Sequence, residues 1–114
     1  MDALEMLLLF DFYGDMLAER QRMCLDLRYN QDFSLAEIAE ELGVSRQSVH
    51  MNIVHAETHL QEIEAKTGCV RRCLQSRAAK QTILSVAAEL ENHSDPAVRA
   101  AIAKIMAAAG SIEE

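Results

Sequence analysis

Residues 34–42 carry the clearest helical pattern of apolar and polar positions in the chain. Their apolar residues recur every three or four positions, as on one face of an α-helix: Leu35, Ile38, Ala39 and Leu42. Ser34 stands immediately before them as an N-cap, and Glu37 three residues later completes a capping box. Gly43 follows, where a helix that must turn sharply needs a residue that tolerates a positive φ. The pattern therefore predicts a short helix that ends at a tight turn.

A second helix is predicted directly after this glycine. Val44 fills the turn, and Ser45 is the N-cap of the next helix. Val49 and Ile53 are four residues apart, so both are expected to face back toward the preceding helix. Two helices joined by so short a turn indicate a helix-turn-helix, a module whose usual work is to place one helix against nucleic acid.

The rest of the chain is also predicted to be helical, so the expected fold class is all-α. The expected helices span residues 3–13, 17–30, 34–42, 45–66, 70–91 and from 96 onward. The positions expected to face the core in the first two are Leu4, Leu7, Leu8 and Phe12, then Leu17, Met23 or Cys24, Leu27 and Tyr29. Gly68 is the expected stop of the long fourth helix, and Asp95 with Pro96 begins the sixth. We therefore expect a helix-turn-helix module over 1–67 and a C-terminal helical extension over 68–114.

Two apolar seams with alternating steps of four and three residues predict helix pairing. The first consists of Val49, Ile53, Ala56, Leu60 and Ile63, and the second of Val98, Ile102, Ile105 and Ala109. Such spacing is typical of a helix that packs along another helix over several turns. We therefore expect a homodimer, in which the C-terminal helices either pack on their own module or exchange between chains.

Composition narrows the class of protein. Half of the 114 residues are hydrophobic, enough for a core without metal or disulfide staples, and one Pro with four Gly fits an all-helical chain. Three cysteines make an odd count without a disulfide framework, which indicates a reducing compartment and a cytoplasmic location. The apolar run Leu7–Phe10 is far shorter than a membrane span, so no membrane partner is expected.

The charge is distributed unevenly along the chain. Residues 1–64 hold 13 acidic residues against four arginines, residues 65–88 hold five basic residues and no acid, and the total is −7. Non-specific nucleic-acid binding depends on neutralising phosphates. An acidic helix-turn-helix must therefore use a local basic patch, bind a protein instead, or bind nucleic acid weakly.

The segment around the predicted module resembles the YlxM family of small bacterial helix-turn-helix proteins. The matching pieces are Phe10-Asp11-Phe12-Tyr13, Arg20-Gln21-Arg22, Leu27, Tyr29, Asp32, Ser34–Leu42, Val44-Ser45-Arg46-Gln47, Val49, Asn52 and Ile53. The resemblance covers about residues 4–66. It implies a four-helix module similar to region four of sigma factors and a regulatory role with the signal recognition particle, whose RNA or GTPase would be the partner. Residues 54–59 contain no Lys or Arg, so promoter recognition of the sigma kind is not expected.

The first candidate contact surface is the start of the fourth helix. It contains Arg46, Gln47, Ser48, His50, Met51 and Asn52. Free N–H groups at a helix start suit a phosphate, and Gln or Asn can read a base edge. A solvated face with Ser45 as its cap is the alternative. Arg20 and Arg22 either clamp a nucleic-acid backbone or form ordinary ion pairs with Glu19 or Asp26.

The second candidate contact surface is the basic stretch after the module. It holds Lys66, Arg71, Arg72, Arg77 and Lys80. These cations either meet RNA phosphates or offset the acidic N-terminal half of this chain or of a partner subunit. On a helical projection Arg71, Arg72, Arg77 and Lys80 point in different directions, so they do not form one stripe.

No metal, cofactor or enzymatic activity is expected. His55 and His59 are four residues apart, but Glu57 is not in the position that a zinc-protease motif requires. Cys69 and Cys73 are also four apart, not two as in zinc ribbons. The chain shows no phosphate-cradling glycine loop and no nucleophile–base set. Three classes of function stay open: an accessory protein of the signal recognition particle, a regulator that reads duplex DNA, and a dimeric interaction module without nucleic-acid binding.

Overall fold

The structure is a computed structural model that describes residues 2–113, and in this range it consists of helices and their connections. The helices are α1 (Ala3–Tyr13), α2 (Glu19–Leu25), α3 (Leu35–Leu42), α4 (Arg46–Thr67), α5 (Cys69–Ala88) and α6 (Pro96–Gly110). A short 3₁₀ turn, η1 (Gly14–Met16), follows α1, and a π turn, η2 (Asp26–Asn30), follows α2. The expected all-α class is confirmed. The chain divides into two units, residues 1–70 and 71–114.

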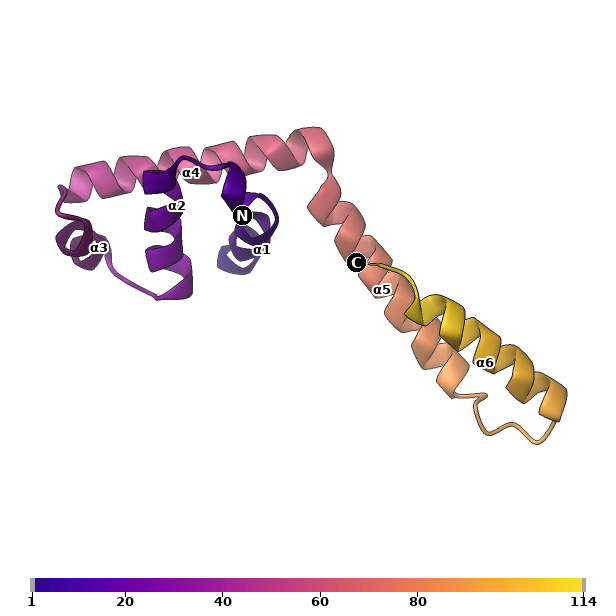
Figure 1. The fold of residues 1–114 in the computed structure, drawn as a ribbon. Helices are drawn as coiled ribbons and strands as arrows, with labels where there is room; N and C mark the ends of the chain where they lie inside the picture. Colours follow the sequence, from indigo (N-terminus) through magenta and orange to yellow (C-terminus); the bar gives the residue numbers. More distant parts are fainter. Residues whose placement is uncertain (1, 114) are drawn as a thin grey trace. The chain divides into compact units, whose positions relative to one another are not determined.

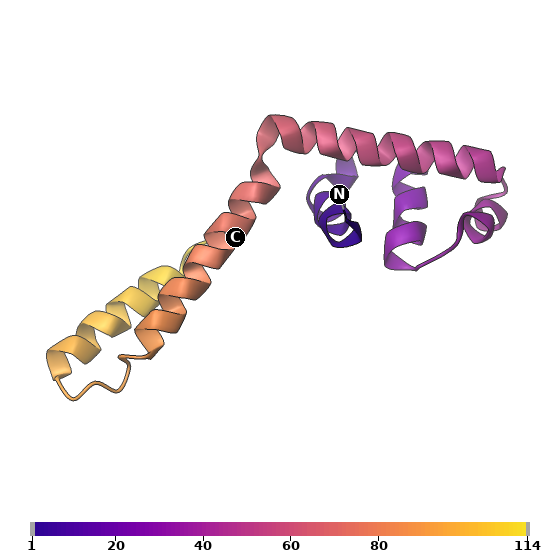
Figure 2. The ribbon, with the colours of Figure 1, turned by 180° about the vertical axis from the view of Figure 1, so that it is seen from behind.

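In the first unit, α4 is the helix on which the other three pack. Helices α1, α2 and α3 all contact it and lie on the same side of it in both views, with α2 crossing it at a steep angle (Figures 1 and 2). The side chains of α4 that they cover are Val49, Ile53, Ala56 and Leu60, all of them buried. The first apolar seam therefore serves the core of its own unit. Steps of four and three residues are typical both of a helix that packs within its own chain and of one that pairs with a second chain, so the spacing does not distinguish the two.

The face of α1 that packs against α4 differs from the expected one. Met6, Leu9 and Tyr13 are buried, whereas Leu4 is 69% exposed and Phe12 is 43% exposed. Nearly every residue of this helix is apolar, so hydrophobic spacing alone cannot select a face. The expectation of a stripe through Leu4 and Phe12 was wrong.

The second expected helix is also different in detail. Helix α2 continues as the wider turn η2, in which the Gln31 N–H donates to the Asp26 carbonyl oxygen (3.3 Å) and the Phe33 N–H to that of Leu27 (2.9 Å). Within α2, Cys24 and Leu25 are fully buried and Met23 is 38% exposed. Leu25 is a core residue that the pattern did not single out.

Both tyrosines bind α4 by hydrogen bonds. The Tyr13 hydroxyl donates to Glu64 Oε1 (2.6 Å) and lies 2.7 Å from Thr67 Oγ1, and the Tyr29 hydroxyl donates to Glu57 Oε1 (2.8 Å). Burial, together with the bonded carboxylate of Glu57, raises the pKa of Tyr29 to about 12. Burial and Glu64 likewise raise the pKa of Tyr13. These bonds join the end of α1 and the turn η2 to α4.

The second unit is a helical hairpin in which α5 and α6 run antiparallel, side by side (Figures 1 and 2). Asp95 caps α6 by accepting from the Ala97 N–H (2.9 Å), and Pro96 occupies its first turn, as expected. Helix α5 ends at Ala88, three residues earlier than expected, because turn hydrogen bonds replace helical ones from Glu89 onward.

The core of the second unit is small. Among its described residues, the buried ones are Ala87, Ile102 and Ala109. Ile105 was expected in the same seam as Ile102, but it is 47% exposed. The second seam is therefore only partly covered by α5.

Candidate nucleic-acid interface

The turn between α3 and α4 has the geometry that the sequence predicts. Gly43 ends α3 with φ +67°, and the Val44 N–H returns to the Ala39 carbonyl oxygen (3.0 Å). At the start of α3 the Ser34 N–H donates to Glu37 Oε1 and the Glu37 N–H to Ser34 Oγ, both at 3.1 Å. The capping box, the left-handed glycine and the following helix are all present, so the helix-turn-helix is confirmed.

Buried side chains hold α4 from behind. Val49 and Ile53 are buried in the core that also contains Ile38 and Ala39 of α3. Ser45 caps α4 by accepting from the Ser48 N–H (3.0 Å). These contacts determine which side of α4 faces solvent over its first two turns.

We call residues 46–52 on the outer side of α4 the Arg46–Asn52 surface. Arg46, Gln47, His50 and Met51 are exposed there. Ser48 and Asn52 are half-buried. Asn52 Nδ2 donates a hydrogen bond to the Ser48 carbonyl oxygen (2.9 Å). The Asn52 amide is thus partly occupied within its own helix, which reduces its capacity to read a base edge.

Sequence reasoning did not include one neighbour of this surface. Val54 lies four residues after His50 and three after Met51, and it is exposed. Helical spacing from His50 and Met51 could have found it. An exposed apolar side chain at this place can contact a base methyl group or an apolar patch of a protein.

The charges around the turn have opposite signs on the two helices. The first turn of α4 carries Arg46 and no acid, so its N–H groups and positive helix end favour an anion. Helix α3 carries exposed Glu37, Glu40 and Glu41. Hydrogen bonds from the backbone and hydroxyl of Ser34 lower the pKa of Glu37, so its carboxylate is ionised at neutral pH.

Arg20 and Arg22 are both exposed on α2, but their surroundings differ from those of Arg46. Arg22 lines a shallow groove together with Asp15, Met23, Asp26 and Phe10. Two acidic residues, Asp15 and Asp26, thus line the same groove as Arg22. This setting favours the intramolecular role for Arg22 over a clamp on a nucleic-acid backbone.

The basic stretch lies on α5, in the second unit apart from Lys66 at the end of α4. Arg71 and Arg72 are exposed, whereas Arg77 and Lys80 are half-buried. Lys80 Nζ donates to the Ile112 carbonyl oxygen just beyond α6 (3.4 Å). Arg71 and Arg72 are thus the more accessible pair, and Lys80 links the middle of α5 to the segment after α6.

The histidines and cysteines do not gather. His55 and His59 are exposed on α4, and Cys24, Cys69 and Cys73 are free thiols. Burial raises the pKa of Cys24, which makes it less reactive. Within residues 2–113, no three His, Cys, Asp or Glu side chains meet in a way that would hold a metal ion. In the same range, none of the helices has both the length and the apolar character needed to span a bilayer.

The turn, the anchored second helix and its exposed first turns define a helix-turn-helix protein. A family described as "Putative helix-turn-helix protein, YlxM / p13 like" matches residues 1–96, and the chain belongs to this family, UPF0122. A UPF0122 protein of Symbiobacterium thermophilum is 42% identical over 107 residues, 94% of each chain. A relative in Acetivibrio thermocellus is 46% identical over 80 residues, covering 70% of this chain and 68% of the relative. One in Halalkalibacterium halodurans is 54% identical over 63 residues, 55% of this chain and 58% of the relative.

Proposed function

We propose that this protein is a cytoplasmic accessory protein of the signal recognition particle that regulates it by binding its RNA, its GTPase or both. The observation that carries the proposal is the Arg46–Asn52 surface, which displays Arg46, Gln47 and His50 on a helix anchored by Val49 and Ile53. The particle itself is implied by the resemblance to the YlxM family over about residues 4–66. The helix-turn-helix exposes the start of α4 for binding, and the resemblance implies the identity of the ligand.

The charge of α3 favours RNA or a protein over duplex DNA. In helix-turn-helix complexes with DNA, the first helix of the motif crosses the phosphate backbone. Here that helix is α3, with exposed Glu37, Glu40 and Glu41, which would repel the phosphates. RNA loops and ends are bound without such a crossing. A basic surface on the GTPase would also be attracted to residues 1–70, which hold 13 acidic and five basic residues.

The direct test is binding of the purified chain to the particle's RNA and to its GTPase at low and moderate salt. Arg46→Gln combined with Gln47→Ala removes charge and hydrogen-bonding capacity from exposed positions without touching the core. We expect affinity to fall by about tenfold or more, the effect of losing one good polar contact. Lys104→Gln, also exposed and also losing one positive charge, is the matched control. A wild-type chain that binds neither partner at low salt would end this proposal.

A second variant tests the role of the basic stretch separately from that of the Arg46–Asn52 surface. We propose that Arg71 and Arg72, the exposed pair on α5, contribute contacts to RNA phosphates. Reversing both charges (Arg71→Glu, Arg72→Glu) should then weaken RNA binding and reduce its dependence on salt. Reversal of all four charges, including Arg77 and Lys80, with partner binding intact would instead favour an interaction module that does not use nucleic acid.

Duplex DNA is the second candidate, and the motif geometry itself favours it. The exposed Arg46, Gln47 and His50 occupy the part of a recognition helix that enters a major groove. A selection from random duplexes tests it. An enriched sequence whose binding is lost in the Arg46→Gln, Gln47→Ala variant supports a DNA regulator, and the absence of any enrichment rejects it.

A further inference from the structure

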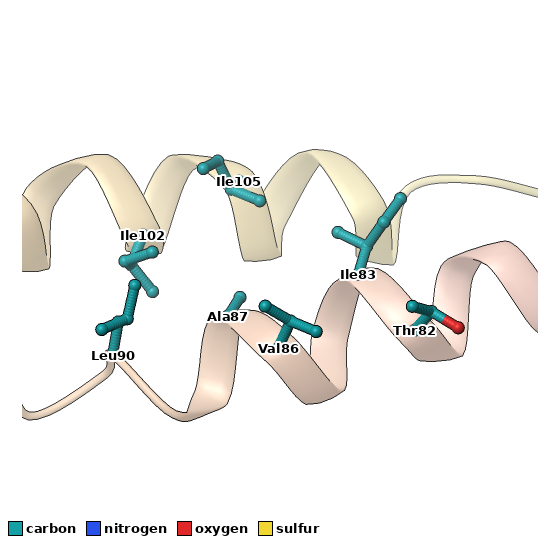
Figure 3. A pocket seen from close by; sticks show the side chains of 7 residues that line it. All are labelled: Thr82, Ile83, Val86, Ala87, Leu90, Ile102 and Ile105. Atoms are coloured by element: carbon teal, nitrogen blue, oxygen red, sulfur yellow. The ribbon is translucent and has the colours of Figure 1, made fainter.

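The hairpin of α5 and α6 carries an open apolar groove. The groove has a volume of about 440 Å³, and the residues that line it are Thr82, Ile83, Val86, Ala87, Leu90, Ile102 and Ile105 (Figure 3). Ile83 and Ala87 point from α5 toward α6, and Leu90 and Ile102 point toward each other. Thr82 is the polar member, and its hydroxyl already donates to the Ala78 carbonyl oxygen (3.1 Å). The lining therefore offers apolar contact and no polar group that needs a partner.

Several large side chains of this groove are uncovered. Val86 is 55% exposed, and Ile83, Leu90 and Ile105 are between 39% and 47% exposed. Ile83 and Val86 lie three residues apart on α5, and Leu90 lies in the turn just beyond its end. All three line the same groove, so they form one apolar stripe along the hairpin. A contiguous exposed apolar surface of this kind marks a place where another surface packs.

The hairpin also has too little core to be stable by itself. It comprises residues 71–114, its only cysteine is a free thiol, and its described buried residues are Ala87, Ile102 and Ala109. Small units of this size generally depend on a disulfide, a metal or an additional packing surface. Covering the groove would convert its half-exposed Ile, Val and Leu side chains into core.

We propose that a second copy of this chain covers the groove, so that α5 and α6 of two chains form a four-helix bundle. Residues 71–114 hold six basic and five acidic residues, so two hairpins meet with almost no net charge. Residues 1–70, with 13 acidic and five basic residues, would instead repel their counterpart in a second chain. An apolar groove that faces its own copy across a two-fold axis is matched in both length and chemistry.

The rest of the described chain offers no comparable stripe. In residues 2–70 the exposed large apolar side chains are spread over α1, η1, α2 and α4: Leu4, Phe12, Met16, Met23, Met51 and Val54. The other apolar surface of matching extent is thus the same hairpin in a second molecule. This proposal does not depend on the ligand of the Arg46–Asn52 surface.

The test measures the mass of the full chain by sedimentation and light scattering at micromolar concentration. The wild-type protein should have twice the mass of the 12.7 kDa chain. Val86→Glu and Ile105→Glu each place a charge in the groove at a position that is exposed in the single chain, so we expect the dimer dissociation constant to rise by about 100-fold or more. Leu4→Glu adds the same charge at an exposed apolar position of α1 and should leave the mass unchanged. A wild-type mass of 12.7 kDa, or dissociation by Leu4→Glu but not by the groove variants, would overturn the proposal.

Amide hydrogen exchange of the wild-type protein provides a second measurement that needs no variant. Protection of the α5 and α6 amides should rise with protein concentration in the range where the mass rises, whereas protection in α1 to α4 should not. Concentration-independent protection of α5 and α6 across that range would mean that the groove is covered within the chain, which also contradicts the proposal.

Discussion

The two units of this protein contain similar helices but bury very different amounts of them. The first unit fully buries large side chains, among them Leu25, Ile38, Val49 and Leu60. The described part of the second unit buries Ile102 and two alanines. In the first unit, three helices share a fourth, so each apolar face meets another. Two helices alone meet along a single line and leave apolar side chains on either side of it.

This difference separates two tasks. Because α4 is held by a core behind it, its outer side can be polar and available to a ligand. Because the α5–α6 hairpin lacks such a core, its outer side stays apolar and suits assembly. The first unit thus combines a large core with a polar surface, whereas the second combines a small core with an apolar surface.

The largest expected effect is a loss of unfolding free energy when a core side chain of the first unit is shortened, compared with the same change in the second unit. Leu60→Ala removes a fully buried side chain of α4, and such changes cost about 2–5 kcal/mol of unfolding free energy. Leu74→Ala on α5 removes the same atoms from a side chain that is 40% exposed, so we expect a loss below about 1 kcal/mol. Urea unfolding followed by circular dichroism measures both. Equal losses would show that the two units do not differ in packing as described.

Removal of the α3 cap should have a smaller effect. Ser34→Ala deletes the hydroxyl that accepts from the Glu37 N–H, and losses of this kind are about 1 kcal/mol. Ser34→Asp keeps an acceptor at the same place and should retain most of the stability. The same unfolding experiment compares the two variants, and an alanine variant as stable as wild type would contradict the role of the capping box.

The third effect is confined to alkaline solution. Tyr29 has a pKa of about 12 in the folded protein, whereas a tyrosine outside a folded environment has a pKa of 10.0. The folded state therefore holds the proton of the Tyr29 hydroxyl more tightly than the unfolded state does. Its contribution to stability is complete below pH 10 and is lost as the pH rises toward 12. Ultraviolet difference absorbance can follow this directly, since the chain has two tyrosines and no tryptophan. Tyr29→Phe should remove the component that titrates near pH 12, and an unchanged titration curve in that variant would reject the assignment.

The smallest expected effect concerns the presented surface. Arg46→Gln should change the unfolding free energy by less than about 0.5 kcal/mol, because Arg46 is exposed and lies outside the core. Its effect on ligand binding should be much larger. A substantial loss of stability would mean that Arg46 stabilises the fold. The residues that bind the ligand would then not be distinct from those that stabilise the first unit.

Local features made the motif predictable from sequence. The N-caps Ser34 and Ser45, the glycine at φ +67° and the anchors Val49 and Ile53 act over a few residues, and the structure has all of them. The buried face of α1 was not predictable, because a helix that is apolar all round has no preferred side. The observed face is the one that packs on α4 and places the Tyr13 hydroxyl against Glu64, and these contacts join residues far apart in the sequence.

The candidate contact residues were predictable to the extent that helical spacing determines exposure. Gln47 and His50 lie on the outer side of α4 as spacing indicates. The half-burial of Asn52 and its bond to the Ser48 carbonyl oxygen depend on side-chain conformation, which spacing does not encode. Likewise, the bond from Lys80 to the Ile112 carbonyl oxygen requires the return of α6, which the sequence left open.

Gly43 has a consequence for how the presented helix can be altered. A Cβ atom built at this residue meets no other atom within 4 Å, although its φ of +67° strains most side chains. The restriction at this corner is thus torsional rather than steric. Asparagine adopts that torsion more readily than other L-residues, and its Cβ atom would find open space beside Val44. Residue 43 is therefore a position where the chemistry beside the recognition helix can be varied while the bend between α3 and α4 keeps its shape.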